Sequence, residues 1–208
     1  MGSLLPELKK QFGGKFYITP AVKFELIDRP LQIKRFKFEA LQVIKFLRDG
    51  VLEVYEDVPQ KEVAALKRVV NSAFKISNKS VDLIQEGEIE SALSAIKEGS
   101  SIVMDERTLR LLIESSKDVK SLLKRRFHKA VQVDEIKLKA FSSRFKTLNI
   151  VRSVELMSVA YKMKLFEDYV PTGKGGRDTL IDAFLWAAKT NGCAMTEHEI
   201  EEIKQSLL

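Results

Sequence analysis

The sequence predicts an α/β fold in which a mostly parallel sheet is covered by helices on both faces. Short runs of β-branched and aromatic residues alternate along the chain with longer segments in which apolar residues recur every three or four positions. The first pattern is typical of strands and the second of amphipathic helices, and their alternation indicates parallel strands joined by helical connections. The 208 residues, 45% of them hydrophobic, are enough to bury a core without disulfide or metal support.

Five segments are predicted as strands, because each is short and rich in apolar or β-branched residues. They lie at residues 16–18, 51–55, 101–104, 131–133 and 149–151. In a parallel sheet of this kind the ligand crevice lies outside the carboxyl ends of the strands. Functional side chains are therefore expected just after the strands.

The predicted helices carry recognisable start and stop residues. Pro20 and Pro59 suit the first turn of a helix, and Gly50 suits the position after the last turn. Thr196 and Glu199 have the spacing of a capping box at the start of the last helix. The expected helices lie at 20–27, 33–49, 59–74, 87–98, 106–116 and 119–128, around Leu138, Phe141 and Phe145, after a cap at Ser153, at 178–191 and from Thr196 onward.

The predicted organisation is one α/β domain with a helical extension. Residues 1–170 form the domain, residues 171–177 form a Gly-rich loop, and residues 178–208 form helices packed on the same domain. The loop lacks the residue order of a P-loop and follows no clear strand, so it is interpreted as a mobile loop.

Composition and charge indicate the cellular compartment and the kinds of partner to expect. No apolar run approaches the roughly 20 residues that a bilayer span requires, and no signal peptide is expected, so the protein is predicted to be cytoplasmic with no membrane partner. The single cysteine, Cys193, forms no internal disulfide and fits that setting. A net charge of +6 favours an anionic partner such as nucleic acid. A lysine- and glutamate-rich composition can also reflect adaptation to heat.

Acidic side chains stand where predicted strands end or predicted helices begin. Glu25 follows the first strand, Glu88 lies in the first turn of a helix, and Asp105 and Glu106 come directly after the strand at 101–104. Carboxylates that converge at strand ends can hold Mg²⁺ or Mn²⁺, which take oxygen ligands and assist phosphodiester hydrolysis. Glu88 can equally complement a helix dipole, and Asp105 can cap the helix that follows it, so both interpretations stay open.

Residues 33–38 are a candidate surface for RNA. This segment interleaves Lys34 and Arg35 with Phe36 and Phe38. Alternating cations and aromatic rings are typical of surfaces that bind single-stranded nucleic acid. Both rings are also expected in the core, and that alternative is the favoured one.

Other basic residues are further candidates for RNA contact. The densest cluster spans residues 124–129, where a solvated helix end is the alternative interpretation. The first three residues of this cluster are the cations Lys124, Arg125 and Arg126. Arg107 and Arg110 stand beside the acidic pair and can contact a phosphate, or can pair with Glu106 and Glu114 along their own helix.

Four segments together resemble the PIN-domain family. Gly87-Glu-Ile-Glu-Ser-Ala-Leu-Ser-Ala-Ile96 and then Ser101-Ile-Val-Met-Asp-Glu-Arg-Thr-Leu-Arg110 resemble the family's Gly-Glu helix and the apolar strand that ends in paired acids. Tyr17-Ile-Thr-Pro-Ala-Val-Lys-Phe-Glu25 resembles its second strand and the helix that carries its second acid. The tail 191–199 is similar to its closing helices. The resemblance covers residues 4–113 and 178–206.

The resemblance implies a three-layer α/β/α fold and a ribonuclease that depends on Mg²⁺ or Mn²⁺. It implies that Glu25, Glu88 and Asp105 are catalytic and bind the metal, with Glu106 as an alternate or outer ligand. The carboxyl groups of the first three are expected within about 10 Å of one another, the span of a shared cation site. The implied partners are RNA, an antitoxin or another protein, and a second copy of the chain.

One departure from the family supports a different function. PIN domains begin with a strand that ends in an acid followed by Ser or Thr, whereas this sequence begins with a segment that resembles the helix after that strand. Without that first acid, metal binding and cleavage are expected to be weak. The alternative prediction is therefore a non-catalytic PIN-like module that binds RNA or a protein.

Overall fold

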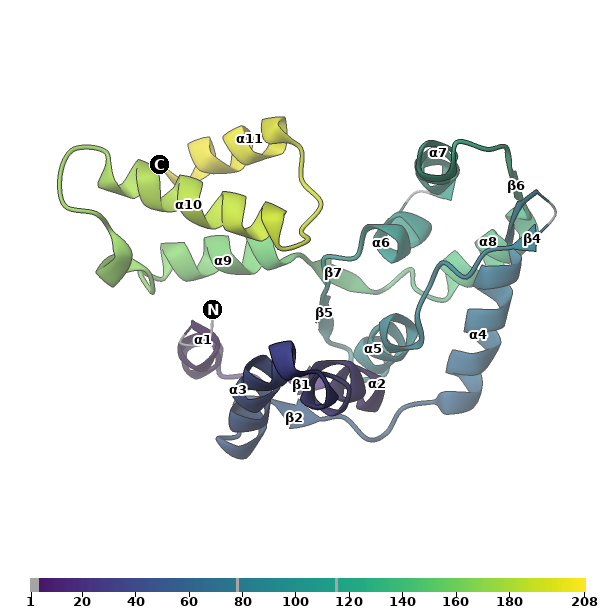
Figure 1. The fold of residues 1–208 in the computed structure, drawn as a ribbon, viewed down its shortest axis with the longest axis horizontal. Helices are drawn as coiled ribbons and strands as arrows, with labels where there is room; N and C mark the ends of the chain where they lie inside the picture. Colours follow the sequence, from purple (N-terminus) through teal and green to yellow (C-terminus); the bar gives the residue numbers. More distant parts are fainter. Residues whose placement is uncertain (1–3, 78, 115) are drawn as a thin grey trace. The chain divides into compact units, whose positions relative to one another are not determined.

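The computed structural model describes residues 4–77, 79–114 and 116–208, and it has an α/β fold (Figure 1). The chain divides into two compact units. Unit 1 contains Met1–Gly13, Val103–Arg107 and Ile150–Leu208, and unit 2 contains Gly14–Ile102 and Thr108–Asn149. Among the described residues, every helix is too short or too polar to cross a membrane.

The predicted strands are confirmed, and the described strands form three small sheets. In unit 2, β1 (Tyr17–Ile18) pairs in parallel with β2 (Glu53–Val54). A second sheet has the order β4-β3-β6, with β3 (Phe74–Ile76) antiparallel both to β4 (Lys79–Ser80) and to β6 (Val131–Val133). β5 (Ser101–Val103) pairs with β7 (Asn149–Val151), and the chain passes between the two units within these strands.

The helices of unit 2 follow the predicted apolar patterns with shifted ends. α2 (Pro20–Lys23) continues into a π-helical turn, Phe24–Asp28. The remaining helices are α3 (Lys37–Arg48), α4 (Gln60–Ser72), α5 (Glu86–Lys97), α6 (Arg107–Glu114, whose first residue belongs to unit 1), α7 (Ser116–Phe127) and α8 (Glu135–Ser143).

Two predicted helix boundaries in unit 2 are wrong. The helix expected through residue 74 ends at Ser72, because Phe74 and Ile76 enter the buried face of a strand that pairs with β6. The helix expected from residue 33 begins at Lys37, because Ile33 has an extended backbone between two short 3₁₀ turns. Ile33 and Phe36 therefore leave the apolar stripe of α3 and are exposed.

Unit 1 is helical and has its own core. Its helices are α1 (Leu4–Phe12), α9 (Ser153–Lys162), α10 (Gly176–Thr190) and α11 (Glu197–Leu207). The buried side chains that α9, α10 and α11 share include Met157, Ile181, Leu185 and Ile200. Gly176 begins α10 so close to the carbonyl oxygen of Pro171 that a β-carbon would not fit there.

The capping predictions in unit 1 have different outcomes. The capping box at Thr196 is confirmed, because its hydroxyl accepts from the backbone N–H of Glu199 and the Glu199 carboxylate accepts from the backbone N–H of Thr196. The prediction that Ser153 caps α9 is wrong. Ser153 is the first residue of this helix, and Arg152 occupies the cap position.

A buried carboxyl group joins three helices of unit 2. Glu90 of α5 is 2% exposed. Its Oε2 accepts a hydrogen bond of 3.0 Å from the backbone N–H of Ala21 in α2, and its Oε1 accepts one of 2.7 Å from the side-chain amide of Gln60 in α4. A buried carboxyl group destabilises a fold unless it is paired, so the burial of Glu90 depends on α2 and α4 being in place.

Replacing Glu90 by alanine should destabilise unit 2 strongly. The variant leaves the part-buried backbone N–H of Ala21 without its acceptor, and a buried unpaired donor costs about 1–3 kcal/mol, whereas the amide of the exposed Gln60 can turn to water. Urea denaturation followed by circular dichroism measures the loss of unfolding free energy. The matched control is Glu86→Ala in the same helix, which removes only an exposed ion pair with Lys67 and should cost less than about 1 kcal/mol. Equal losses in the two variants would contradict this role of Glu90.

Candidate functional site

Two of the predicted metal ligands lie in unit 2, and the structure brings one of them beside the helix that carries the other. Glu25 belongs to the exposed π-helical turn after α2. Its Oε1 lies 3.3 Å from the point where a β-carbon of Gly87 would stand. Gly87 is buried and directly precedes Glu88 in the first turn of α5. Because Gly87 has no side chain, the Glu25 carboxylate can lie close to the start of α5.

Glu88 has a local structural role at the start of its helix. Its Oε2 accepts a hydrogen bond of 2.9 Å from the backbone N–H of Gln85, which closes a capping box. A carboxylate here also complements the positive end of the helix dipole. The helix-end role that the sequence left open for Glu88 is therefore confirmed.

Sequence reasoning overlooked the carboxyl group that is most deeply buried. Glu90 follows Glu88 by two positions and lies three positions before Leu93, which is 1% exposed. An i, i+3 spacing places two residues on the same face of a helix, so the position of Glu90 on the apolar stripe of α5 was the available signal.

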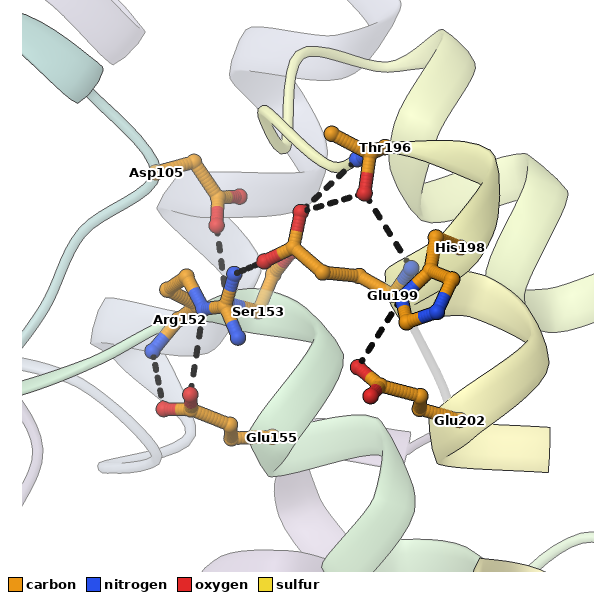
Figure 2. A network of polar contacts seen from close by, with 8 residues as sticks. All are labelled: Asp105, Arg152, Ser153, Glu155, Thr196, His198, Glu199 and Glu202. Carbon is orange, nitrogen blue, oxygen red and sulfur yellow. Dashed lines mark hydrogen bonds and ion pairs between the residues drawn. The ribbon is translucent and has the colours of Figure 1, made fainter. Parts of the chain in front are cut away.

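Asp105 caps a helix far away in the sequence. Its Oδ1 accepts a hydrogen bond of 2.9 Å from the backbone N–H of Ser153, the first residue of α9 (Figure 2). This N–H has no partner within its own helix, because the first four backbone donors of a helix lack internal acceptors. Asp105 therefore performs capping, the alternative considered for it, but on α9 rather than on the following helix, α6.

The one cysteine packs beside this cap. Cys193 is 1% exposed within the core of unit 1. Burial raises the pKa of its thiol above the ordinary value, and a hydrogen bond with the Asp105 carboxylate raises it further. A raised pKa keeps the thiol protonated near neutral pH, so Cys193 acts as a small buried donor rather than as a nucleophile.

Arg152 connects the starts of α9 and α11. Its Nε donates to Glu155 Oε1 at 3.0 Å, and its Nη1 donates to Glu199 Oε1 at 3.3 Å. The other oxygen of Glu199 accepts from the backbone N–H of Thr196 at 2.8 Å (Figure 2). One guanidinium group therefore holds the first turns of two helices in a fixed relation inside unit 1.

The remaining predicted ligands belong to unit 1, whereas Glu25 and Glu88 belong to unit 2. Asp105 and Glu106 belong to the segment Val103–Arg107 of that unit. Within the part of the chain that the structure describes, no three carboxylate, thiol or imidazole groups are arranged to hold a metal ion. The convergence of Glu25, Glu88 and Asp105 on one cation stays a prediction.

The basic segment before α3 is more exposed than expected. Phe36 and Phe38 are 41% and 69% exposed, so the expectation that these rings lie in the core is wrong. The guanidinium carbon of Arg35 lies 5.4 Å from the centre of the Phe36 ring. Lys34 is exposed beside it. In this part of the chain Ala40 is the residue that enters the core, because α3 begins only at Lys37.

The other predicted RNA contacts are spread over α6 and α7. Lys124, Arg125 and Arg126 are exposed in the last turn of α7. Arg107 is exposed at the start of α6. One turn later, the Nε of Arg110 is buried and has no hydrogen-bond partner among the described residues.

Comparisons of the chain with protein-family models, with curated proteins and with solved structures found no match. The resemblance to PIN domains therefore rests on the sequence segments quoted above.

The hydrogen bonds of Glu199 predict a pH dependence for unit 1. The backbone N–H of Thr196 is the main cause that lowers the pKa of Glu199, with smaller contributions from the Thr196 hydroxyl and Arg152. A lowered pKa stabilises the fold above the unfolded value of about 4.3, and this contribution is lost as the pH falls through the folded pKa.

Glu199→Gln should therefore melt at a lower temperature than the native chain at pH 7, and the difference should shrink as the pH falls below about 4.3 and through the lowered pKa of Glu199, because the carboxyl group then becomes protonated in both states. Thermal melts at several pH values measure it. The effect is small because the side chain is partly exposed. A difference that stays constant as the pH falls through this range would contradict this account of Glu199.

Proposed function

We propose that the chain is a PIN-like protein, with the three-layer arrangement of that family, and that it binds single-stranded RNA. The observation that carries the proposal is the exposed segment 33–38, in which aromatic rings alternate with cations. Isolated exposed apolar residues are ordinary on protein surfaces. Two exposed phenylalanines separated by one lysine form a more specific feature, because they present stacking faces and positive charge together.

The charges of this segment are available to a ligand. Lys34, Arg35 and Lys37 are exposed, and no carboxylate among the described residues forms an ion pair with them. Stacking on an aromatic side chain contributes about 1–3 kcal/mol per base and tolerates any base. The neighbouring cations would neutralise phosphates of the same strand. This chemistry suits binding to single-stranded RNA of varied sequence.

Binding without cleavage is the function that we favour. The reason is that carboxylates which the family resemblance assigns to catalysis have structural roles in this fold. Glu88 closes the capping box of α5, and Asp105 caps α9. These hydrogen bonds use oxygens that a metal ion would otherwise take.

A metal-dependent ribonuclease of PIN type is the second candidate. The observation that favours it is the position of the Glu25 carboxylate against Gly87, beside Glu88. Glu25 and Glu88 would contribute to holding Mg²⁺ or Mn²⁺, which would supply an activated water for phosphodiester hydrolysis. In this candidate function the carboxylates would bind the metal ion and orient the water that it activates.

Replacing Phe36 and Phe38 together by alanine should weaken RNA binding by about 1–3 kcal/mol for each ring that stacks on a base. The salt dependence should not change, because no charge is removed. Fluorescence anisotropy with a labelled oligouridylate measures both quantities. The matched control is Tyr169→Ala, which removes a ring that is 63% exposed but flanked by Glu167 and Asp168. Native-like affinity of the double variant would refute the stacking role.

Incubation of labelled RNA with the chain and Mn²⁺ separates the two candidates, and we expect binding without cleavage. For the ribonuclease, cleavage should appear, require the metal, and disappear in Glu88→Gln. Glutamine can still close a capping box, so this variant removes the charge and keeps the helix start. Glu86→Gln, in the same turn, is the control that should leave cleavage unchanged.

A further inference from the structure

A polar hollow lies in unit 2 where α4 ends and α8 begins. Its volume is about 190 Å³, and its lining includes Ser72, Lys75, Gln132, Asp134 and Lys137. One water needs only about 10–15 Å³ of such space, so the hollow has room for a larger polar group. A backbone hydrogen bond of 2.8 Å from the N–H of Asp134 to the carbonyl of Ala73 holds its two sides together. Figure 1 shows α4, β4, β6 and α8 gathered at this place.

The sheet supplies two donors to this hollow. Lys75 is the outward residue of β3, between the buried Phe74 and Ile76. The strand register pairs it with the exposed Gln132 of β6. Directly opposite residues in adjacent strands have β-carbons about 4.5–5.5 Å apart, so the lysine ammonium and the glutamine amide can reach one ligand together.

The third donor comes from α8, and the charges around it leave an excess of positive charge. Lys137 Nζ donates to Ser72 Oγ at 3.0 Å and lies 3.7 Å from Asp134 Oδ2. The other oxygen of Asp134 accepts from the backbone N–H of Lys137. Asp134 thus offsets Lys137, whereas no carboxylate among the described residues pairs with Lys75. The hollow is therefore lined by two lysines and a glutamine, against one carboxylate that is already paired with Lys137.

We propose that this hollow binds a phosphate group, and that the group is part of the RNA backbone. Phosphate oxygens accept several hydrogen bonds at once, which suits two lysines and an amide that converge. This inference rests on the proposed RNA binding and adds a second contact surface to it.

The neighbouring sequence favours an RNA backbone over a small anion. The exposed cations Lys124, Arg125 and Arg126 end α7, which packs against β6. β6 then leads directly to Asp134 and the hollow. The three residues of β6 span about 10 Å at the usual rise of a strand. Basic side chains thus precede and follow a short strand, an arrangement that suits a ligand with repeated phosphates.

The test uses Lys75→Gln in the full chain, with Lys75→Arg as the conservative variant. Each phosphate contact to a single strand contributes roughly −0.7 to the slope of log affinity against log salt. Anisotropy titrations with oligouridylate should therefore show a slope reduced by about 0.7 in Lys75→Gln and restored in Lys75→Arg. Lys79→Gln is the matched control, because Lys79 is an exposed lysine on β4, paired in register with the buried Ile76, and should leave the slope unchanged.

A second measurement separates the two sources of phosphate. Inorganic phosphate titrated at constant ionic strength should shift the backbone amide NMR signals of Lys75, Gln132 and Lys137 in the native chain and not in Lys75→Gln. If RNA binds and the slope of Lys75→Gln equals that of the native chain, this inference is overturned while the proposed function stands.

If RNA does not bind, the proposed function fails. The phosphate titration then decides by itself whether the hollow binds phosphate. Shifts that Lys75→Gln removes would keep the phosphate site and assign it to a small phosphorylated ligand. Absence of shifts would overturn the phosphate site as well.

Discussion

The carboxyl group of Glu90 is the constraint on which the arrangement of unit 2 depends. It is buried in α5 and accepts one hydrogen bond from the backbone of α2 and one from a side chain of α4. A buried acceptor of this kind is favourable only when its donors are in place, so it selects one relative placement of three helices. That placement sets the π-helical turn after α2 against Gly87, and this is why Glu25 lies beside the start of α5.

Unit 1 uses the same principle at its helix ends. Asp105 and Arg152 each lie outside the helices that they support, and together they satisfy groups at the first turns of α9 and α11. The unpaired donors of a helix start attract carboxylates, so an acidic pair after a strand can serve folding as well as chemistry. The resemblance to PIN domains assigns a metal ligand to Asp105, and its observed hydrogen bond to the start of α9 shows why position in the sequence alone does not distinguish the two roles.

The two surfaces that we propose for RNA differ in the chemistry that they offer. The segment before α3 offers exposed rings and cations, which favour unstacked bases with little preference for sequence. The hollow beside β6 offers ammonium and amide donors without aromatic rings, which favours the backbone. Both surfaces carry basic side chains, which would contribute to RNA affinity through contacts with phosphates. This agrees with the net charge of +6.

The sequence by itself determined the elements whose signals are local. Runs of apolar and β-branched residues marked β1, β2, β5, β6 and β7 but not β3 or β4, and the spacing of Thr196 and Glu199 marked the start of α11, because a capping box closes within one helical turn. Only the tertiary structure decided the roles that depend on distant partners. Phe74 left its predicted helix to pair with β6, Glu90 was buried by donors from α2 and α4, and Asp105 capped α9 rather than α6. Each of these outcomes is set by a hydrogen-bond partner far away in the chain, which periodicity and local spacing do not encode.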